Sequence, residues 1–161
     1  MKIIGVPVDL AGLLAGCASL VVFAVAVAGA ATEWPCRPTP ADALGPFYQA
    51  NAPVRASVGQ GYVLSGVVKS AQDCAPIAGA RIEFWLAGPS GDYDGDHRGT
   101  VVADQAGSYR FESNYPPKYS FRPPHIHLKV SAPGFKTLVS QHYPKKGDNQ
   151  ASFDLILIPA G

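Results

Sequence analysis

The alternation of apolar and polar residues predicts many short strands. From residue 62 onward, short apolar runs are separated by Gly, Pro, Asp or Asn, which is the pattern of β-strands joined by turns. No long helical periodicity interrupts this pattern. Seven such runs predict an all-β fold, a single antiparallel β-sandwich of about seven or more short strands. The runs cover residues 62–69, 80–87, 100–103, 108–112, 125–132, 137–143 and 152–158.

The fifth of these runs has two chemically different faces. Side chains in a strand alternate between faces, so Ile126, Leu128 and Val130 share one side. His125 and His127 share the other side, with roots ~6.6 Å apart, so their imidazoles can converge on one ion. A lone His-x-His more often forms ordinary hydrogen bonds than it binds a metal. The strand is therefore predicted to supply core packing and, if other residues support it, metal ligands.

The chain before residue 61 has a different composition. Residues 33–60 contain five prolines and little periodicity, which indicates an extended arm lying over the domain and not a helix. Residues 10–32 include no charged side chain, and the apolar run 20–27 precedes several small residues, as in a secretory signal peptide. The uncharged stretch is also long enough to span a bilayer, so an uncleaved membrane anchor is the alternative.

These patterns divide the chain into three parts. Residues 1–31 are expected to be a signal peptide or an N-terminal anchor, residues 32–60 the extended Pro-rich arm, and residues 61–161 the β-sandwich. The folded part is expected outside the cytoplasm, as a periplasmic, secreted or membrane-tethered protein. If Cys17 leaves with a signal peptide, Cys36 and Cys74 remain as an even pair in an oxidising compartment, which favours a disulfide over two unlinked thiols.

Length and charge narrow the class of function. A chain of 161 residues with 47% hydrophobic and 16% charged residues can bury one sizeable core, and two ordinary domains would not fit. The net charge is +1 and the Lys and Arg residues are scattered, so the basic footprint of a nucleic-acid-binding protein is missing. Chemistry on a small molecule is the simpler prediction.

Two tyrosines and several ordered motifs accompany the histidine pair. Tyr93 follows Trp85 in a turn-rich stretch, and Tyr119 lies six residues before His125. In these features the chain resembles the intradiol ring-cleavage dioxygenases, the family of protocatechuate and catechol dioxygenases, over nearly all of the sequence after the signal segment. The resemblance is carried by Thr39 Pro40, Gly45 Pro46 Phe47 Tyr48, Gly66 Val67 Val68, Pro76 to Ala80, Trp85 to Tyr93, Pro117 Lys118 Tyr119, Arg122 to His127 and Ser140 to Tyr143.

The resemblance implies an Fe(III) site. Hard phenolate oxygens suit a highly charged cation, whereas zinc is more often bound by cysteine or additional histidine. Asp42 and Leu44 depart from the family's opening motif, where Gln and Glu are usual, and Tyr115 is a rival for the second tyrosine ligand. The implied ligands are Tyr93, Tyr119, His125 and His127, and the residues implied to act on the substrate are Tyr119, which leaves the metal, Arg122 and Gln141.

The implied activity is cleavage of a catechol-type ring between its two hydroxylated carbons, with O2 as co-substrate and a muconate-type diacid as product. The ring substituents and the oligomeric state stay open. The alternative function is non-catalytic, because Gly66 to Ala80 and Asp104 to Phe111 also resemble transthyretin-like and carboxypeptidase-regulatory-like modules that bind or space other domains. Such modules do not require two tyrosines, an arginine and a His-x-His together, so this combination favours the enzyme.

Overall fold

The structure is a computed structural model that describes Gly5 and residues 33–161. Within these residues there are eight strands and no helix, so no helix here is long and apolar enough to cross a membrane. Apart from Gly5, the predicted signal segment with Cys17 lies outside the described residues. The strands are β1 (Tyr62–Ser70), β2 (Arg81–Leu86), β3 (Arg98–Val102), β4 (Ser108–Ser113), β5 (Ile126–Ser131), β6 (Leu138–His142), β7 (Gln150–Ser152) and β8 (Leu155–Leu157).

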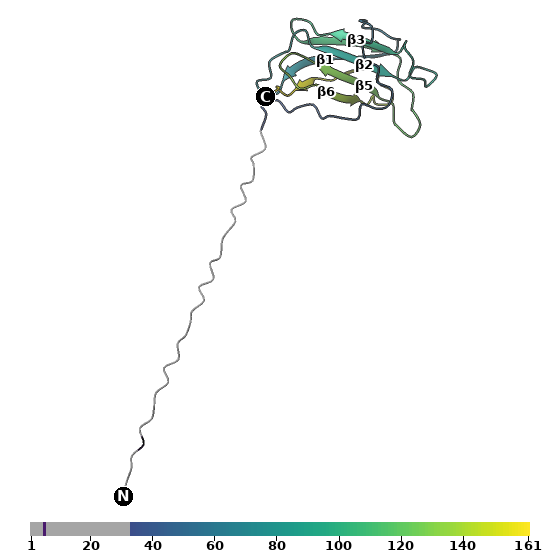
Figure 1. The fold of residues 1–161 in the computed structure, drawn as a ribbon. Helices are drawn as coiled ribbons and strands as arrows, with labels where there is room; N and C mark the ends of the chain where they lie inside the picture. The colour runs from purple at the N-terminus through teal and green to yellow at the C-terminus, as the bar shows by residue number, and fades with distance from the viewer. Residues whose placement is uncertain (1–4, 6–32) are drawn as a thin grey trace. The chain divides into compact units, whose positions relative to one another are not determined.

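The strands form two sheets that pack face to face (Figure 1). One sheet has the order β3-β2-β5-β6, and the other has the order β4-β1-β7 with β8 also paired to β1. The pairs β1 with β4, β2 with β3, β2 with β5 and β5 with β6 are antiparallel. The predicted all-β antiparallel sandwich is therefore confirmed.

The last predicted strand differs in detail from the structure. The run 152–158 is divided into β7 and β8, and both pair with β1 in parallel. The interruption is caused by Asp154, whose Oδ1 accepts a hydrogen bond from the Val67 backbone N–H at 2.9 Å. Asp154 Oδ2 accepts another from Lys69 Nζ at 2.6 Å. A side chain thus replaces a backbone carbonyl as the partner of β1, which separates the two short ladders.

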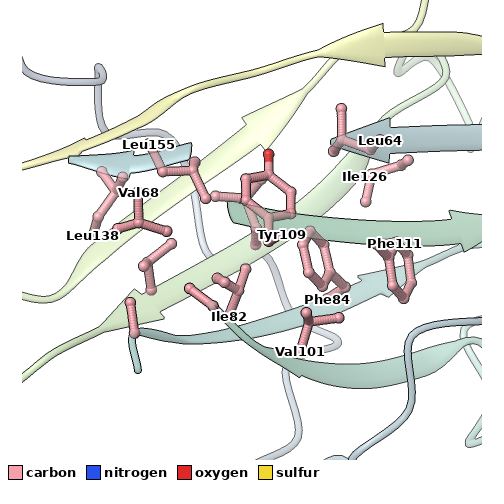
Figure 2. Packing of buried hydrophobic residues seen from close by; sticks show 14 of the residues in the cluster. Leu64, Val68, Ile82, Phe84, Val101, Tyr109, Phe111, Ile126, Leu138 and Leu155 are labelled. Atoms are coloured by element: carbon pink, nitrogen blue, oxygen red, sulfur yellow. The ribbon is translucent and has the colours of Figure 1, made fainter. Parts of the chain in front are cut away.

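The hydrophobic core lies between the two sheets (Figure 2). Ile126, Leu128 and Val130 are fully buried there, which confirms the predicted apolar face of β5. Phe84 of β2 and Phe111 of β4 stack across the interface between the sheets, with ring centroids 4.2 Å apart. Burial of a side chain of this size stabilises the fold by about 1.5–3 kcal/mol. The apolar side chains drawn in Figure 2 therefore hold the two sheets together.

The N-terminal arm is extended and is attached to both sheets. Cys36 forms a disulfide with Cys74, in the turn that follows β1, which confirms the favoured pairing. Asp42 donates its backbone N–H to the Val139 carbonyl of β6 at 2.9 Å, so the arm extends the edge of that sheet. Residue Tyr48 then packs against Trp85 on the sheet's outer face, opposite the core. The arm thereby covers a face that the second sheet does not reach.

The stacked pair in the core provides a test of this packing. Phe111→Ala should lower the free energy of unfolding by about 3–5 kcal/mol, because it removes a fully buried ring and leaves a cavity against Phe84. The loss should be measured by urea denaturation of the oxidised protein. Phe121→Ala is the matched control, since Phe121 is 92% exposed and its removal should change stability by less than about 0.5 kcal/mol. Equal effects of the two substitutions would contradict the described core.

Candidate metal centre

The outer face of the β3-β2-β5-β6 sheet carries a row of polar and aromatic side chains. Strand pairing sets Arg98 of β3 opposite Trp85 of β2, and Trp85 opposite His127 of β5. Gln141 of β6 follows opposite His127. Each of the four side chains is at most 5% exposed, because the arm covers this face. Directly opposed residues on one face of a sheet are in contact, so the row is a continuous buried layer.

Three of the four predicted ligands bring polar atoms together. The Tyr93 hydroxyl lies 2.9 Å from His125 Nε2, and His125 Nε2 lies 3.1 Å from His127 Nε2. Two ligand atoms at right angles around a metal, each with a bond of ~2.1 Å, would be ~3 Å apart. The observed separations are of that size. The three atoms therefore converge closely enough to share one ion.

Each histidine ring is oriented by its neighbours. His125 Nδ1 donates a hydrogen bond to the Pro123 carbonyl oxygen at 2.7 Å, which leaves the lone pair of Nε2 directed at the shared position. His127 Nδ1 has no hydrogen-bond partner among the described residues, and this ring is held by stacking on Trp85 at a centroid distance of 4.9 Å. Gly45 has a φ of +74°, and a Cβ there would lie 2.9 Å from His127 Cε1, so glycine permits the close approach of the arm.

Burial favours the uncharged forms of these groups. Desolvation lowers the pKa of His127 to about 4, and it lowers the pKa of His125 as well. Desolvation, together with nearby Tyr119, raises the pKa of Tyr93 to about 12. Neutral imidazole is the form that binds a metal, so the histidines are ready as ligands at neutral pH. A phenol of raised pKa instead needs a bound cation to hold it as phenolate.

Tyr119 lies beside these groups, and Tyr115 does not. The Tyr119 ring packs edge-on against Tyr93 at a centroid distance of 5.3 Å, and it lines the same cavity as the histidines. Its hydroxyl is not hydrogen-bonded to either histidine. Tyr115 donates its hydroxyl to the Pro144 carbonyl oxygen at 3.3 Å and packs against the core. The geometry thus favours Tyr119 over its rival.

Arg122 and Gln141 are also adjacent in the structure. Arg122 Nη2 donates to Gln141 Oε1 at 2.8 Å and to the Tyr143 hydroxyl at 2.9 Å. Gln141 Nε2 donates to the Ala43 carbonyl oxygen of the arm at 2.6 Å. Since its amide nitrogen is engaged with the arm, Gln141 presents its oxygen to the guanidinium. The six predicted site residues therefore occupy one region.

The region contains a cavity of about 300 Å³. This volume is at the lower end for small-molecule sites and suits a ligand of about one aromatic ring. Two of the surfaces that enclose it come from the arm and from the loop before β5. The lining residues are Gly45, Pro46, Phe47, Tyr93, Tyr119, Ser120, Phe121, Arg122, His125 and His127.

The donor set fits a hard, highly charged cation. Among the described residues no group of three or more His, Cys, Asp and Glu side chains can hold a metal ion, so tyrosine oxygen would have to complete a centre built on the histidine pair. Two imidazole nitrogens with phenol oxygens differ from the cysteine and histidine sets typical of zinc. Ferric iron prefers such hard anionic oxygen donors. The residues present therefore fit Fe(III).

The sequence predicted no role at this site for three residues that the structure places there. Phe47 stacks on Tyr93 with ring centroids 4.4 Å apart and an interplanar angle of 12°. Tyr143 and Asp42 join the hydrogen bonds around Arg122. For Tyr143 the sequence holds a local signal. Residues two apart along a strand share a face, and Tyr143, directly after β6, lies two positions after Gln141. No local pattern connects Asp42 with β6.

The two histidines that received no predicted role lie outside this group. His142 points to the other side of β6, where its Nε2 is 2.7 Å from the Tyr62 hydroxyl, and desolvation lowers its pKa to about 4. His97 Nδ1 is 2.7 Å from Asp94 Oδ1 in the loop before β3. Both rings are therefore engaged in contacts outside the candidate site.

Comparison with known proteins identifies the family of the chain. The family model described as dioxygenase matches residues 45–158. The chain is 33% identical to chlorocatechol 1,2-dioxygenase of Pseudomonas sp. strain P51 over 138 residues, with 65% of this chain and 55% of that protein covered. It is 29% identical to the intradiol ring-cleavage dioxygenase prcA of Aspergillus niger over 150 residues, with 70% and 47% covered. The chain thus spans about half the length of these relatives.

Solved structures share the fold over a larger part of their length. The dioxygenase domain of a dioxygenase and carbohydrate-binding protein fusion from Streptomyces sp. SirexAA-E superposes with a TM-score of 0.68 and 26% identity, covering 77% of this chain and 100% of that domain. The intradiol ring-cleavage dioxygenase of Tetranychus urticae superposes with a TM-score of 0.70 and 18% identity, covering 78% and 97%, and this likeness concerns the fold alone. On the strength of the family match, this chain belongs to the intradiol ring-cleavage dioxygenase family.

Proposed function

We propose that this protein is an Fe(III)-dependent dioxygenase that cleaves a catechol-type ring between its two hydroxylated carbons and forms a muconate-type diacid. The observation that carries the proposal is the convergence of Tyr93 Oη, His125 Nε2 and His127 Nε2 beside a cavity that Tyr119 and Arg122 also line. Membership of the family supports the same reaction. O2 is the proposed co-substrate.

The proposed ligands of the iron are Tyr93, Tyr119, His125 and His127. When bound, Fe(III) would supply a Lewis acid that withdraws electron density from the catechol and makes its ring reactive toward O2. Tyr93 is held by its contact with His125, whereas the Tyr119 hydroxyl has no such contact. Tyr119 is therefore the tyrosine better suited to give way to the substrate and to accept a proton from a substrate hydroxyl.

Arg122 is proposed to act on the substrate, and Gln141 to position the guanidinium of Arg122. The guanidinium of Arg122 is always charged and lines the cavity, so it can stabilise negative charge that develops on the ring. Gln141 and Tyr143 accept hydrogen bonds from the same Nη2 and hold the guanidinium in place. Gly45 of the arm approaches His127 and Phe47 stacks on Tyr93, so the arm would shield this side of the site from water. The arm is thus part of the proposed active site.

The protein is also proposed to function outside the cytoplasm. The signal-like segment predicts export, with the anchor reading as the alternative. The disulfide between Cys36 and Cys74 supports this location, because such bonds persist in oxidising compartments. It attaches the start of the arm, and therefore the residues that cover the site, to the end of β1.

A non-catalytic sandwich module is the competing function. The buried row that includes His127 and Gln141 argues against it, since burial of polar side chains lowers stability unless they serve a purpose or are fully hydrogen-bonded. The unpartnered His127 Nδ1 is one such uncompensated atom among the described residues. A spacer would gain more stability from apolar residues at these positions.

The proposal predicts a coloured ferric protein that consumes catechol. The purified chain, loaded with Fe(III), should absorb visible light, because charge transfers readily from phenolate to ferric iron. Added catechol should shift the band and be converted in air to cis,cis-muconate, measured by absorbance and product chromatography. A colourless protein that takes up no ferric iron and leaves catechol intact would favour the module. A semialdehyde product would indicate cleavage outside the hydroxyl pair, which is associated with ferrous sites of two histidines and a carboxylate.

The two tyrosines should differ when each loses its hydroxyl. Tyr119→Phe should slow catechol binding strongly while retaining more iron than His125→Ala, because Tyr119 has a role beyond holding the metal. Tyr93→Phe should mainly weaken iron binding and the visible absorption. Iron content and stopped-flow absorbance measure both effects, with Tyr115→Phe as the control. Full turnover by Tyr119→Phe together with an inactive Tyr115→Phe would show that the second ligand is Tyr115.

Removal of the Arg122 guanidinium should lower the turnover rate without changing how much iron is bound. Arg122→Ala should lower kcat by about 10²- to 10³-fold, which is the usual loss when a preorganised donor to developing charge is deleted. Iron content should remain that of the unmodified protein. Arg110→Ala is the matched control, because Arg110 pairs with Glu112 on the exposed side of β4. An unchanged kcat at saturating catechol would exclude Arg122 from the mechanism.

A further inference from the structure

The charge of Arg122 is connected to an acidic residue of the arm. Arg122 Nη2 donates to the Tyr143 hydroxyl at 2.9 Å, and that hydroxyl lies 2.8 Å from Asp42 Oδ2. The hydroxyl accepts from Arg122, so its own proton is available to an acceptor. Gln141 Oε1, at 3.0 Å, already accepts a hydrogen bond from Arg122, whereas Asp42 offers a carboxylate, the stronger acceptor. The favoured direction is therefore from Arg122 through Tyr143 to Asp42.

Asp42 is held in this position by the arm. Its backbone N–H donates to the Val139 carbonyl of β6 at 2.9 Å, and its Oδ1 accepts the Ala43 N–H at 2.6 Å. The neighbouring Ala43 carbonyl accepts the Gln141 amide at 2.6 Å. The carboxylate is thus placed one hydroxyl group away from the guanidinium. Hydrogen bonds and the charge of Arg122 keep its pKa below the usual range despite desolvation, so it is ionised at neutral pH.

A second cation, Arg98, lies near the cavity but is not among the residues that line it. Arg98 donates to the carbonyl oxygens of Phe47 at 2.6 Å and Tyr93 at 3.1 Å, so its guanidinium is turned to the backbone behind the cavity wall. Asp94 acts on it as an opposite charge. Arg122 is the one permanently charged side chain among the described residues that line the cavity. With Asp42 as its counter-charge, Arg122 adds little net charge of its own to the cavity wall that faces a ring substituent.

We propose that Asp42, acting through Tyr143, balances the charge of Arg122 and makes the cavity selective for uncharged catechols over catechols that carry a carboxylate. This inference rests on the proposed function, because it assumes that a catechol occupies the cavity. A carboxylate near Arg122 would meet the repulsion of Asp42 and would lose most of the attraction of the guanidinium. An uncharged catechol meets neither effect, so its binding depends little on this pair.

The test compares two ligands on the ferric protein. Dissociation constants for catechol and 3,4-dihydroxybenzoate are measured anaerobically by calorimetry, so that binding is observed without turnover. Asp42→Asn keeps the acceptor for the Ala43 N–H and removes one negative charge. Asp42→Asn should lower the dissociation constant of 3,4-dihydroxybenzoate relative to that of catechol by about two- to fivefold at low salt, the range for one solvent-exposed charge. About 0.5 M NaCl should largely abolish the shift, because the Debye length falls to a few ångströms.

Two further variants separate charge from structure. Asp104→Asn makes the same change in net charge on the turn after β3, at the end of that strand away from Arg98, and it should leave the ratio unchanged. Tyr143→Phe keeps the carboxylate but removes the connecting hydroxyl, and it should shift the ratio in the same direction by a smaller factor. A Tyr143→Phe ratio equal to that of the unmodified protein would overturn the route through Tyr143.

The outcomes distinguish this inference from the proposed function. An Asp42→Asn ratio that stays unchanged at low salt, or a shift that persists in high salt, would overturn the selectivity while catechol turnover by the unmodified protein still supports the dioxygenase. If the unmodified ferric protein neither binds nor cleaves any catechol, the proposed function fails and the selectivity fails with it. A salt-sensitive shift confined to Asp42→Asn and Tyr143→Phe supports both.

Discussion

Alternation along β5 couples the hydrophobic core to the candidate metal centre. Ile126 and Leu128 are fully buried between the sheets, and this burial fixes the height and register of the strand between β2 and β6. His127 lies between them in sequence and therefore on the opposite face, against Trp85. A slip of one residue would exchange the two faces, so the free energy that stabilises the core also determines where the imidazole lies.

The arm completes what the sheet leaves open. A two-layer sandwich has an outer face with no second sheet against it, and extended chain has few internal hydrogen bonds to hold it there. A covalent bond and side-chain hydrogen bonds hold the arm there instead: the disulfide at Cys36, and Tyr48, whose hydroxyl donates to Glu83 at 3.1 Å and accepts from Lys129 at 2.8 Å. Because Phe47 directly precedes Tyr48 in the sequence, these attachments also position Phe47 as the aromatic wall of the cavity.

Local periodicity was enough to predict the strands and the two-faced character of β5, because side-chain alternation depends only on neighbours in sequence. The tyrosines were predicted from resemblance to a family, and the structure brings Tyr119 to the histidines across a turn that no period describes. Contacts made by Asp42 depend on an arm that reaches Tyr143, 101 positions further along the chain. The division of the last strand was missed because Asp154 competes with the backbone for Val67, a choice made by tertiary contacts.

In the proposed chemistry, two different sets of groups compensate the positive charge of the metal and the negative charge on the substrate. Neutral His125 and His127 can bind an ion but cannot compensate its charge, and burial makes ionisation of Tyr93 unfavourable until a cation arrives. The positive charge of the metal would therefore be compensated by the tyrosine phenolates. Without a metal, Tyr93 and the histidines of the site are uncharged. Charge on the substrate is instead met by Arg122, which is charged at all times and is held by Gln141 and Tyr143. Because a permanent cation would also attract unwanted anions, its connection to Asp42 lets it act mainly on charge that develops within the cavity, where the guanidinium is nearest.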